Sequence, residues 1–191
     1  MQLKQYWDYS GEQNNRTTIL TRVLFITYLA GLFWIIVLKF NAPIAYMGKM
    51  RSVNLVPFKR PLILNGKVDF GEMILNVLIF VPLGMYAGAL FKSWNIAKQV
   101  FLFFLVSFIC EASQYILKLG VSDITDIIDN TLGGIIGLLI FKATAKAFND
   151  SVKAQKILNV VATTGTILLI SLLLFLKMGH LWLFRMKPLH R

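Results

Sequence analysis

Five apolar runs divide this chain, and each is close to the length of a membrane-crossing helix. An α-helix rises about 1.5 Å per residue, so roughly 20 apolar residues cross the hydrocarbon layer of a bilayer, which is about 30 Å thick. The runs are Ile19–Leu38, Met73–Leu90, Ala97–Leu117, Ile127–Phe141 and Ile157–Leu176. We therefore expect an all-α fold, a multi-pass transmembrane helical bundle of about five spans, with a long structured loop between spans one and two.

The composition excludes a water-soluble globule. Apolar residues make up 57% of the chain and charged residues 15%, whereas soluble domains contain about 45–50% and about 25%. The net charge is +11, but the Lys and Arg residues concentrate between the apolar runs. That pattern is typical of loops that face anionic lipid headgroups, not of a groove for nucleic acid. We expect membrane lipids, and no nucleic acid, among the partners.

The apolar runs also set the domain organisation. They divide the chain into a polar N-terminal segment, a membrane domain and a basic interfacial tail, at residues 1–18, 19–176 and 177–191. The segment between spans one and two contains Val53–Phe58, which is too apolar for ordinary solvent-exposed coil and predicts a structured or partly re-entrant loop. The Lys-rich hairpin 142–156 and the acidic loop around Asp123 favour an N-terminus inside the cell.

The third span carries polar residues on one helical face. Glu111, Gln114 and Lys118 are spaced i, i+3, i+7, and Ser107 continues the stripe one turn earlier. A carboxyl group at membrane depth is costly and normally faces the bundle interior or a water-filled cavity. Two interpretations remain open: a contact that joins two helices, or a buried carboxyl group that binds a ligand or a proton.

The fourth span begins with a similar stripe of Asp123, Asp126 and Asn130. Acids in the first turn can cap a helix and complement its dipole, which explains the two aspartates but not Asn130, about two turns in. Asp129 adds a third carboxylate, and carboxylate oxygens are ligands that suit Mg²⁺. The three aspartates are therefore the candidate metal ligands, if the protein binds a metal.

The second span has one polar stripe and a proline near its middle. Pro82 is expected to kink the helix and to free backbone carbonyl groups, and we favour a structural role for this kink. The stripe recurs every four residues, at Glu72, Asn76, Phe80 and Gly84.

Small residues in the fourth span predict close helix packing. Gly133 and Gly137 have the spacing of a GxxxG pair, which brings helices together inside a bundle or between two chains, so an oligomer through these glycines stays open. Asp126, Asn130 and Gly134 share a face, so the acidic stripe is expected to face protein rather than lipid.

Four sequence blocks occur together within residues 54–137: NLVPF, NVLIFVPLG, EASQ and DITDIIDNTLGGIIG. In this order and spacing they resemble the VanZ-like family of bacterial membrane proteins. The resemblance implies a ligand-binding or polar cluster made of Asn54, Asn76, Glu111, Gln114, Asp123, Asp126 and Asn130.

The resemblance also implies a function. It implies a multi-pass protein of the bacterial cytoplasmic membrane, in the cell envelope of Gram-positive bacteria, that lowers susceptibility to glycopeptide antibiotics such as teicoplanin by reducing drug action at the cell surface. Its ligand would be a cell-wall precursor or a glycopeptide-related molecule. The residues themselves show no Ser/His/Asp arrangement and no Gly-rich phosphate loop. We therefore expect no catalytic residue, no cofactor and a protein that is not an enzyme.

Two alternatives remain open. The first is a metal-dependent enzyme or carrier that acts on a lipid-linked phosphate, with Mg²⁺ on the aspartates and with Lys59, Arg60 or Lys118 neutralising the phosphate charge. The second is a proton- or ion-coupled transporter built around Glu111 and Asp126, although the sequence contains no internal repeat of the kind that transporters often have.

Overall fold

A computed structural model of the protein describes residues 2–38, 50–58, 62–64, 67–117 and 119–185. Within these ranges the helices are α1 (Gln2–Leu38), α2 (Gly71–Leu90), α3 (Ile96–Leu117), α4 (Ile124–Ala147) and α5 (Ser151–Arg185). The strands are β1 (Met50–Asn54), β2 (Leu62–Leu64), β3 (Lys67–Asp69) and β4 (Leu119–Asp123). The predicted all-α helical bundle is confirmed.

Four helical segments of the described chain are long and apolar enough to cross a membrane. They are Asn15–Val37, Gly71–Leu90, Ile96–Leu117 and Ile124–Ala147. These segments contain the first four predicted spans almost completely. The fifth predicted span lies within α5, but most side chains beyond Leu168 are outside the described residues. The predicted polar segment 1–18 is helical from Gln2 and continues directly into the first span.

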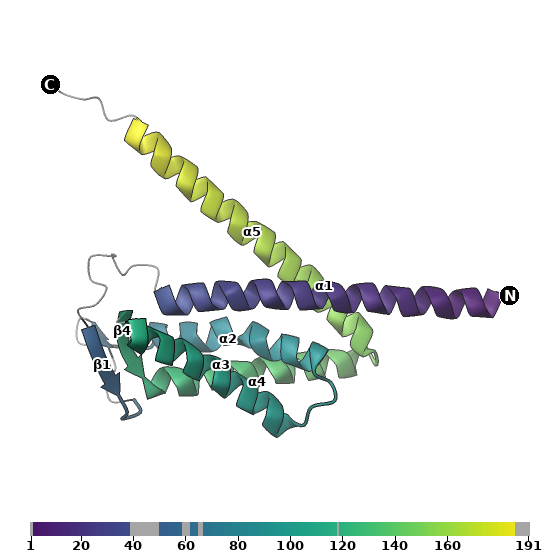
Figure 1. Ribbon diagram of the computed structural model, residues 1–191, viewed down its shortest axis with the longest axis horizontal. Coiled ribbons are helices and arrows are strands. Elements are labelled where there is room, and N and C mark those ends of the chain that lie inside the picture. The colour runs from purple at the N-terminus through teal and green to yellow at the C-terminus, as the bar shows by residue number, and fades with distance from the viewer. Residues whose placement is uncertain (1, 39–49, 59–61, 65–66, 118, 186–191) are drawn as a thin grey trace.

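The helices form one bundle with one divergent member. In Figure 1, α2, α3 and α4 lie together, α1 runs along them, and α5 crosses α1 near its own start before it leans away. The strands lie at the end of the bundle where α1 and α3 end and where α2 and α4 begin. The bundle therefore places one end of four helices beside the segment that joins the first two spans.

Glycines bring α2 and α4 into backbone contact. A Cβ atom on Gly137 would lie 1.8 Å from the carbonyl oxygen of Val81, and one on Gly133 would lie 2.1 Å from the carbonyl oxygen of Val77. No side chain fits at such distances, so these positions require glycine. Both glycines make their close approach to α2 of the same chain, and an oligomer through them stays a prediction. Gly134 instead faces Phe103 of α3. The face that Gly134 shares with the acidic stripe is thus turned toward protein at this position, as predicted.

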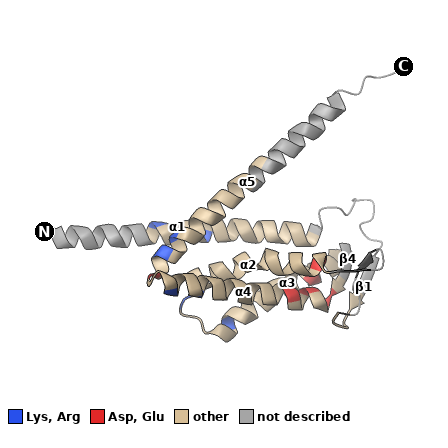
Figure 2. Ribbon diagram, turned by 180° about the vertical axis from the view of Figure 1, so that it is seen from behind, with Lys and Arg blue, Asp and Glu red and all other residues tan. Residues whose placement is uncertain are grey.

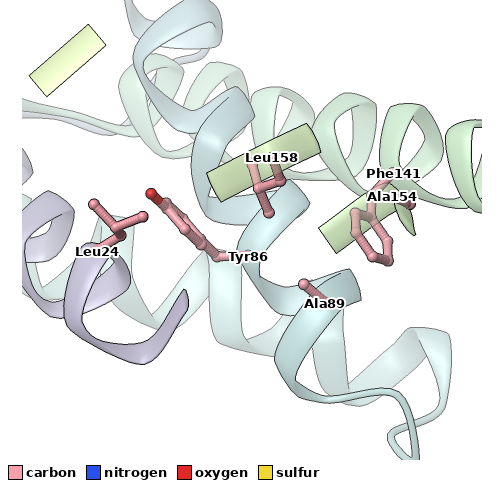
Figure 3. Close-up of a cluster of buried hydrophobic side chains, with 6 residues drawn as sticks. All are labelled: Leu24, Tyr86, Ala89, Phe141, Ala154 and Leu158. Atoms are coloured by element: carbon pink, nitrogen blue, oxygen red, sulfur yellow. The ribbon is translucent and has the colours of Figure 1, made fainter. Parts of the chain in front are cut away.

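Two clusters of buried apolar side chains fill the space between the helices. Figure 3 shows the first, in which α1, α2, α4 and α5 contribute Leu24, Tyr86, Ala89, Phe141, Ala154 and Leu158. The second joins α1, α2, α3 and α4 through Leu32, Phe80, Leu83, Ala87, Phe103 and Leu138. In a bilayer such interfaces are held mainly by close van der Waals packing, because lipid tails are as apolar as the side chains. The two clusters together hold the five helices of the described chain against one another.

Helix α2 continues through Pro82 and receives a hydrogen bond in the turn that the proline disrupts. The Tyr28 hydroxyl of α1 donates to the carbonyl oxygen of Ile79 over 2.7 Å. Proline has no N–H group, so the carbonyl oxygen of Leu78, four residues before Pro82, lacks its helical donor. The Tyr28 bond is made to the next carbonyl in the same turn and holds α1 against this part of α2. The structural role of Pro82 stays a prediction.

The segment between the first two spans contains short strands where it is described. β1 pairs with β4 in parallel, with Met50 opposite Leu119 and Asn54 opposite Asp123. β2 and β3 form an antiparallel pair. The parallel pair connects this segment to the start of α4. Asn54 and Asp123, which lie opposite each other, are 69 positions apart in the sequence. The prediction of a structured segment is therefore confirmed for the described part.

Charged residues separate along the bundle (Figure 2). Carboxylates gather beside β1 and β4, at what we call the acidic end: Glu72, Glu111, Asp123, Asp126 and Asp129. At the opposite, basic end the described basic residues are Arg16, Arg22, Lys92, Lys98, Lys142, Lys146, Lys153 and Lys156. Cytoplasmic loops usually carry an excess of Lys and Arg. An N-terminus inside the cell, with the acidic end outside, stays a prediction.

Candidate ligand-binding cavity at the acidic end

The seven predicted polar residues lie together at the acidic end, although they come from three helices, one strand and one helix cap. A cavity of about 670 Å³ has Glu72, Asn76, Glu111, Gln114, Asp126 and Asn130 among its lining residues. Its apolar wall is formed by Ile35, Ile36, Leu75, Leu78 and Ile79. Five of the seven predicted residues therefore line one cavity: Asn76, Glu111, Gln114, Asp126 and Asn130.

Asn76 and Asp126 connect α2 to α4 across this cavity. The Asn76 side-chain amide donates to the Asp126 carboxylate over 2.7 Å. Asp126 is in the first turn of α4, so the helix dipole also favours its negative charge. The dipole alone does not account for the position, because the carboxylate is held at the cavity wall by a partner from another helix.

Glu111 lies between two cavities and is 2% exposed. Its Oε2 atom accepts hydrogen bonds from the Ser122 hydroxyl and from the backbone N–H of Asp123, each over 3.1 Å. Glu111 also lines a second cavity of about 400 Å³ between α3, α4 and β1. Glu111 therefore joins α3 to the β4–α4 junction and also lines both cavities. Binding of a ligand or a proton by this carboxyl group stays a prediction.

Asp123 caps helix α4 and anchors β1. One carboxylate oxygen accepts from the backbone N–H of Thr125 over 2.8 Å, as an N-cap residue does. The other accepts from the Asn54 side-chain amide, also over 2.8 Å. The predicted capping role is confirmed, and Asn54 supplies a second partner that the spacing within the span did not indicate.

The segment 54–58 packs against the start of α4 in a strained conformation. The Phe58 backbone has φ 56°, a left-handed value that is uncommon for bulky residues. Its N–H donates to the Thr125 hydroxyl over 3.1 Å. Strained backbone persists where its surroundings hold it, and such positions concentrate at functional sites. Leu55 at the edge of the second cavity is 70% exposed, so an apolar side chain lies open beside the polar cluster.

Two amides at the large cavity each retain an oxygen atom without a donor. The Gln114 amide nitrogen donates to the carbonyl oxygen of Ile36 over 2.7 Å, which orients the amide. The Asn130 amide nitrogen donates to the Ser107 hydroxyl over 2.9 Å. Gln114 Oε1 and Asn130 Oδ1 are buried without a hydrogen-bond partner in the described chain, at a cost of roughly 1–3 kcal/mol each. The acidic end is therefore rich in acceptors and short of donors.

The candidate metal ligands do not form one group. No three His, Cys, Asp or Glu side chains in the described ranges are arranged to hold a metal ion. Asp123 and Asp126 bond to different asparagines, and Asp129 is buried, with Oδ2 lacking a partner. The predicted phosphate-neutralising residues Lys59, Arg60 and Lys118 lie outside the described residues. Magnesium stays a prediction that belongs to the lipid-phosphate alternative.

The prediction from the sequence did not include one residue of the cavity and one polar network. Glu72, at the cavity, was placed on a helical stripe but not in the site. The network lies between α1 and α5 at the basic end and consists of Thr17, Thr21, Gln155 and Asn159, all buried. Its signal in the sequence is the i, i+4 spacing of each pair, which places both members on one helix face.

The fold and this cavity define a class: a multi-pass α-helical membrane protein with a polar, carboxylate-lined cavity at one end. Residues 25–149 match the model of the VanZ/LLP1 family. The chain is 33% identical over 159 residues to Protein VanZ of Enterococcus faecium, an alignment that covers 82% of this chain and 92% of that protein. No solved structure matches the chain. The chain belongs to the VanZ/LLP1 family, which confirms the resemblance carried by the four sequence blocks.

Proposed function

We propose that this protein is a multi-pass protein of the bacterial cytoplasmic membrane that lowers susceptibility to glycopeptide antibiotics such as teicoplanin. It acts without catalysis, by reducing drug action at the cell surface. The acidic end is the part that acts, and its cavity holds a ligand related to the cell-wall precursor or to the drug. The family and the glycopeptide association implied by the resemblance support this proposal.

One observation carries the assignment to the acidic end. The polar residues of four separate sequence blocks converge there, and five of them line the same cavity. Residues that only joined neighbouring helices would not need to surround a space of about 670 Å³. Buried acceptors without donors favour a ligand that carries hydrogen-bond donors or positive charge.

The test measures binding of fluorescent teicoplanin to intact cells of a sensitive Gram-positive host. Strains express the wild type, Glu111→Gln, Asp150→Asn or no protein, at matched membrane levels. Asp150 is the carboxylate at the basic end that caps α5, and asparagine caps a helix about as well. It is thus a matched loss of one negative charge outside the proposed site.

We expect the wild type and Asp150→Asn to reduce drug binding several-fold and Glu111→Gln to leave binding at the level of the empty host. Unchanged drug binding in cells that express the wild type would contradict the proposed function. Equal protection by all three proteins would contradict the role of the acidic end but not the function itself.

A further inference from the structure

A separate cavity of about 540 Å³ lies between α1 and α5 at the basic end. It shares no residue with the cavities at the acidic end. Its lining includes the cations Arg16 and Lys156, the hydroxyl-bearing Thr163 and Thr164, and the apolar Leu20 and Val160. In Figures 1 and 2 the two helices cross near the start of α5 and then diverge. The residues that line the cavity come from both helices.

A network of hydrogen bonds joins the two helices beside this cavity, and two of its members, Thr17 and Asn159, line the cavity. The Thr21 hydroxyl lies 2.9 Å from Asn159 Oδ1 and 2.8 Å from the amide nitrogen of Gln155. The Asn159 amide nitrogen donates to the carbonyl oxygen of Thr17 over 3.1 Å. These groups bond to one another, so the network positions α1 against α5.

The charge at the mouth of the cavity is positive. Arg16 and Lys156 are exposed and come from different helices. The nearby described carboxylate is Asp150, whose pKa is lowered by hydrogen bonds from the backbone N–H groups of Val152 and Lys153 and by the charges of Lys153 and Lys156. Among the described residues beside the cavity, the three cations Arg16, Lys153 and Lys156 accompany the one carboxylate of Asp150.

Two of the three threonines that line the cavity, Thr163 and Thr164, differ from several other threonines of the helices. Thr27, Thr131, Thr144 and Thr166 each donate to a carbonyl oxygen four residues earlier. Thr163 and Thr164 make no such bond among the described residues. A hydroxyl that is not used inside its own helix is available to a ligand.

We infer that this cavity binds a phosphate group, and that its occupant is the headgroup of an anionic membrane lipid. The order of side chains along the helices matches such a molecule. The cations come first, Leu20 and Val160 follow one turn deeper on their own helices, and the free hydroxyls lie on the next turn of α5. Basic pockets between transmembrane helices bind anionic headgroups by this combination of charge and hydrogen bonding.

The test uses the purified full chain and counts bound lipid by native mass spectrometry, with phosphatidylglycerol and phosphatidylcholine as probes. The double variant Arg16→Gln/Lys156→Gln removes the cations of the cavity. The control Lys98→Gln/Lys142→Gln removes the same charge from two basic-end positions that do not line it. Thr163→Val/Thr164→Val keeps the shape of the side chains and removes only the hydroxyls. This variant tests the same cavity if the first variant does not fold.

We expect phosphatidylglycerol to bind about 25-fold more weakly to Arg16→Gln/Lys156→Gln, at about fivefold per cation. The threonine variant should lose a few-fold, and the control should match the wild type. Equal losses in both charge variants, or equal binding of the two lipids by the wild type, would overturn the inference. A third arm adds millimolar inorganic phosphate: unchanged lipid binding supports the lipid, and displacement of the lipid would overturn it as the occupant.

Discussion

Two clusters of buried polar side chains, one near each end of the bundle, differ in how their groups are bonded. At the basic end Thr17, Thr21, Gln155 and Asn159 carry no charge and satisfy one another. At the acidic end the cluster contains carboxylates, surrounds cavities and leaves the amide oxygens of Gln114 and Asn130 without donors. The closed network stabilises the fold, whereas the open cluster retains unmet binding capacity, which is what a site for a ligand requires.

The largest expected effect concerns the backbone contact between α2 and α4, the helices that extend between the two ends. Gly137→Ala places a methyl group against the Val81 carbonyl oxygen, so α2 and α4 must separate. We expect a loss of at least about 3 kcal/mol in unfolding free energy, or no folded protein, because overpacking at a backbone contact cannot relax. Thermal unfolding in detergent measures this. Gly31→Ala is the control, since a Cβ there meets nothing within 4 Å; equal stability of the two variants would refute the backbone contact.

The next effect concerns the anchor of the acidic end. Asp123→Ala removes both the cap of α4 and the partner of Asn54. We expect a destabilisation of about 2 kcal/mol, the upper part of the range for a lost cap. Asp123→Asn retains a capping oxygen and should recover most of this stability. Denaturant-induced or thermal unfolding compares the two variants, and identical losses would mean that the cap is not formed.

A smaller effect tests the closed network at the basic end. Thr21→Val keeps the shape of the side chain and removes the hydroxyl that joins Gln155 and Asn159. We expect a destabilisation of about 1 kcal/mol, typical of hydrogen bonds between membrane helices, with no change in drug binding. Thr27→Val removes a hydroxyl that bonds only within its own helix and should change little. A loss of drug protection in Thr21→Val would contradict a purely structural role of the network at the basic end.

The smallest effect is a pH dependence at the basic end. Hydrogen bonds from the N–H groups of Val152 and Lys153 lower the pKa of Asp150 below its ordinary value of 3.8. Because the folded-state pKa is depressed, Asp150 stabilises the fold above that ordinary value, and the stabilisation disappears as the pH falls through the folded-state pKa. The difference in unfolding midpoint between the wild type and Asp150→Asn should therefore shrink on acidification. A difference in unfolding midpoint that stays constant with pH would contradict a stabilising role of the ionised Asp150.

The spans could be predicted from the sequence because apolar length is a local property. Each predicted span up to the fourth falls almost entirely within a helix that meets the length and hydropathy of a membrane span. The start of α4 at Ile124 agrees with the predicted cap Asp123. The apolar count did not place the start of α1, which is helical from Gln2, because polar residues also form helix. Helix ends depend on capping and on polar sequence that an apolar count ignores.

The members of the acidic cluster could be predicted, but their connections could not. Helical spacing placed Glu111 with Gln114, and Asp126 with Asn130, on shared faces. The bonds from Asn54 to Asp123 and from Asn76 to Asp126 join residues far apart in the chain, and no periodicity within one segment specifies them. The α1–α5 network escaped for the same reason, because its two halves lie more than 130 positions apart.

The most direct test of the central claim compares the two clusters in the same cells. Teicoplanin susceptibility is measured in a sensitive Gram-positive host that expresses the wild type, Asp126→Asn or Thr21→Val at equal membrane abundance. Asp126→Asn removes one charge from the cavity wall, and Thr21→Val breaks the closed network. The account predicts that Asp126→Asn loses protection and that Thr21→Val keeps it. Protection by Asp126→Asn at the wild-type level would contradict the assignment of function to the acidic end.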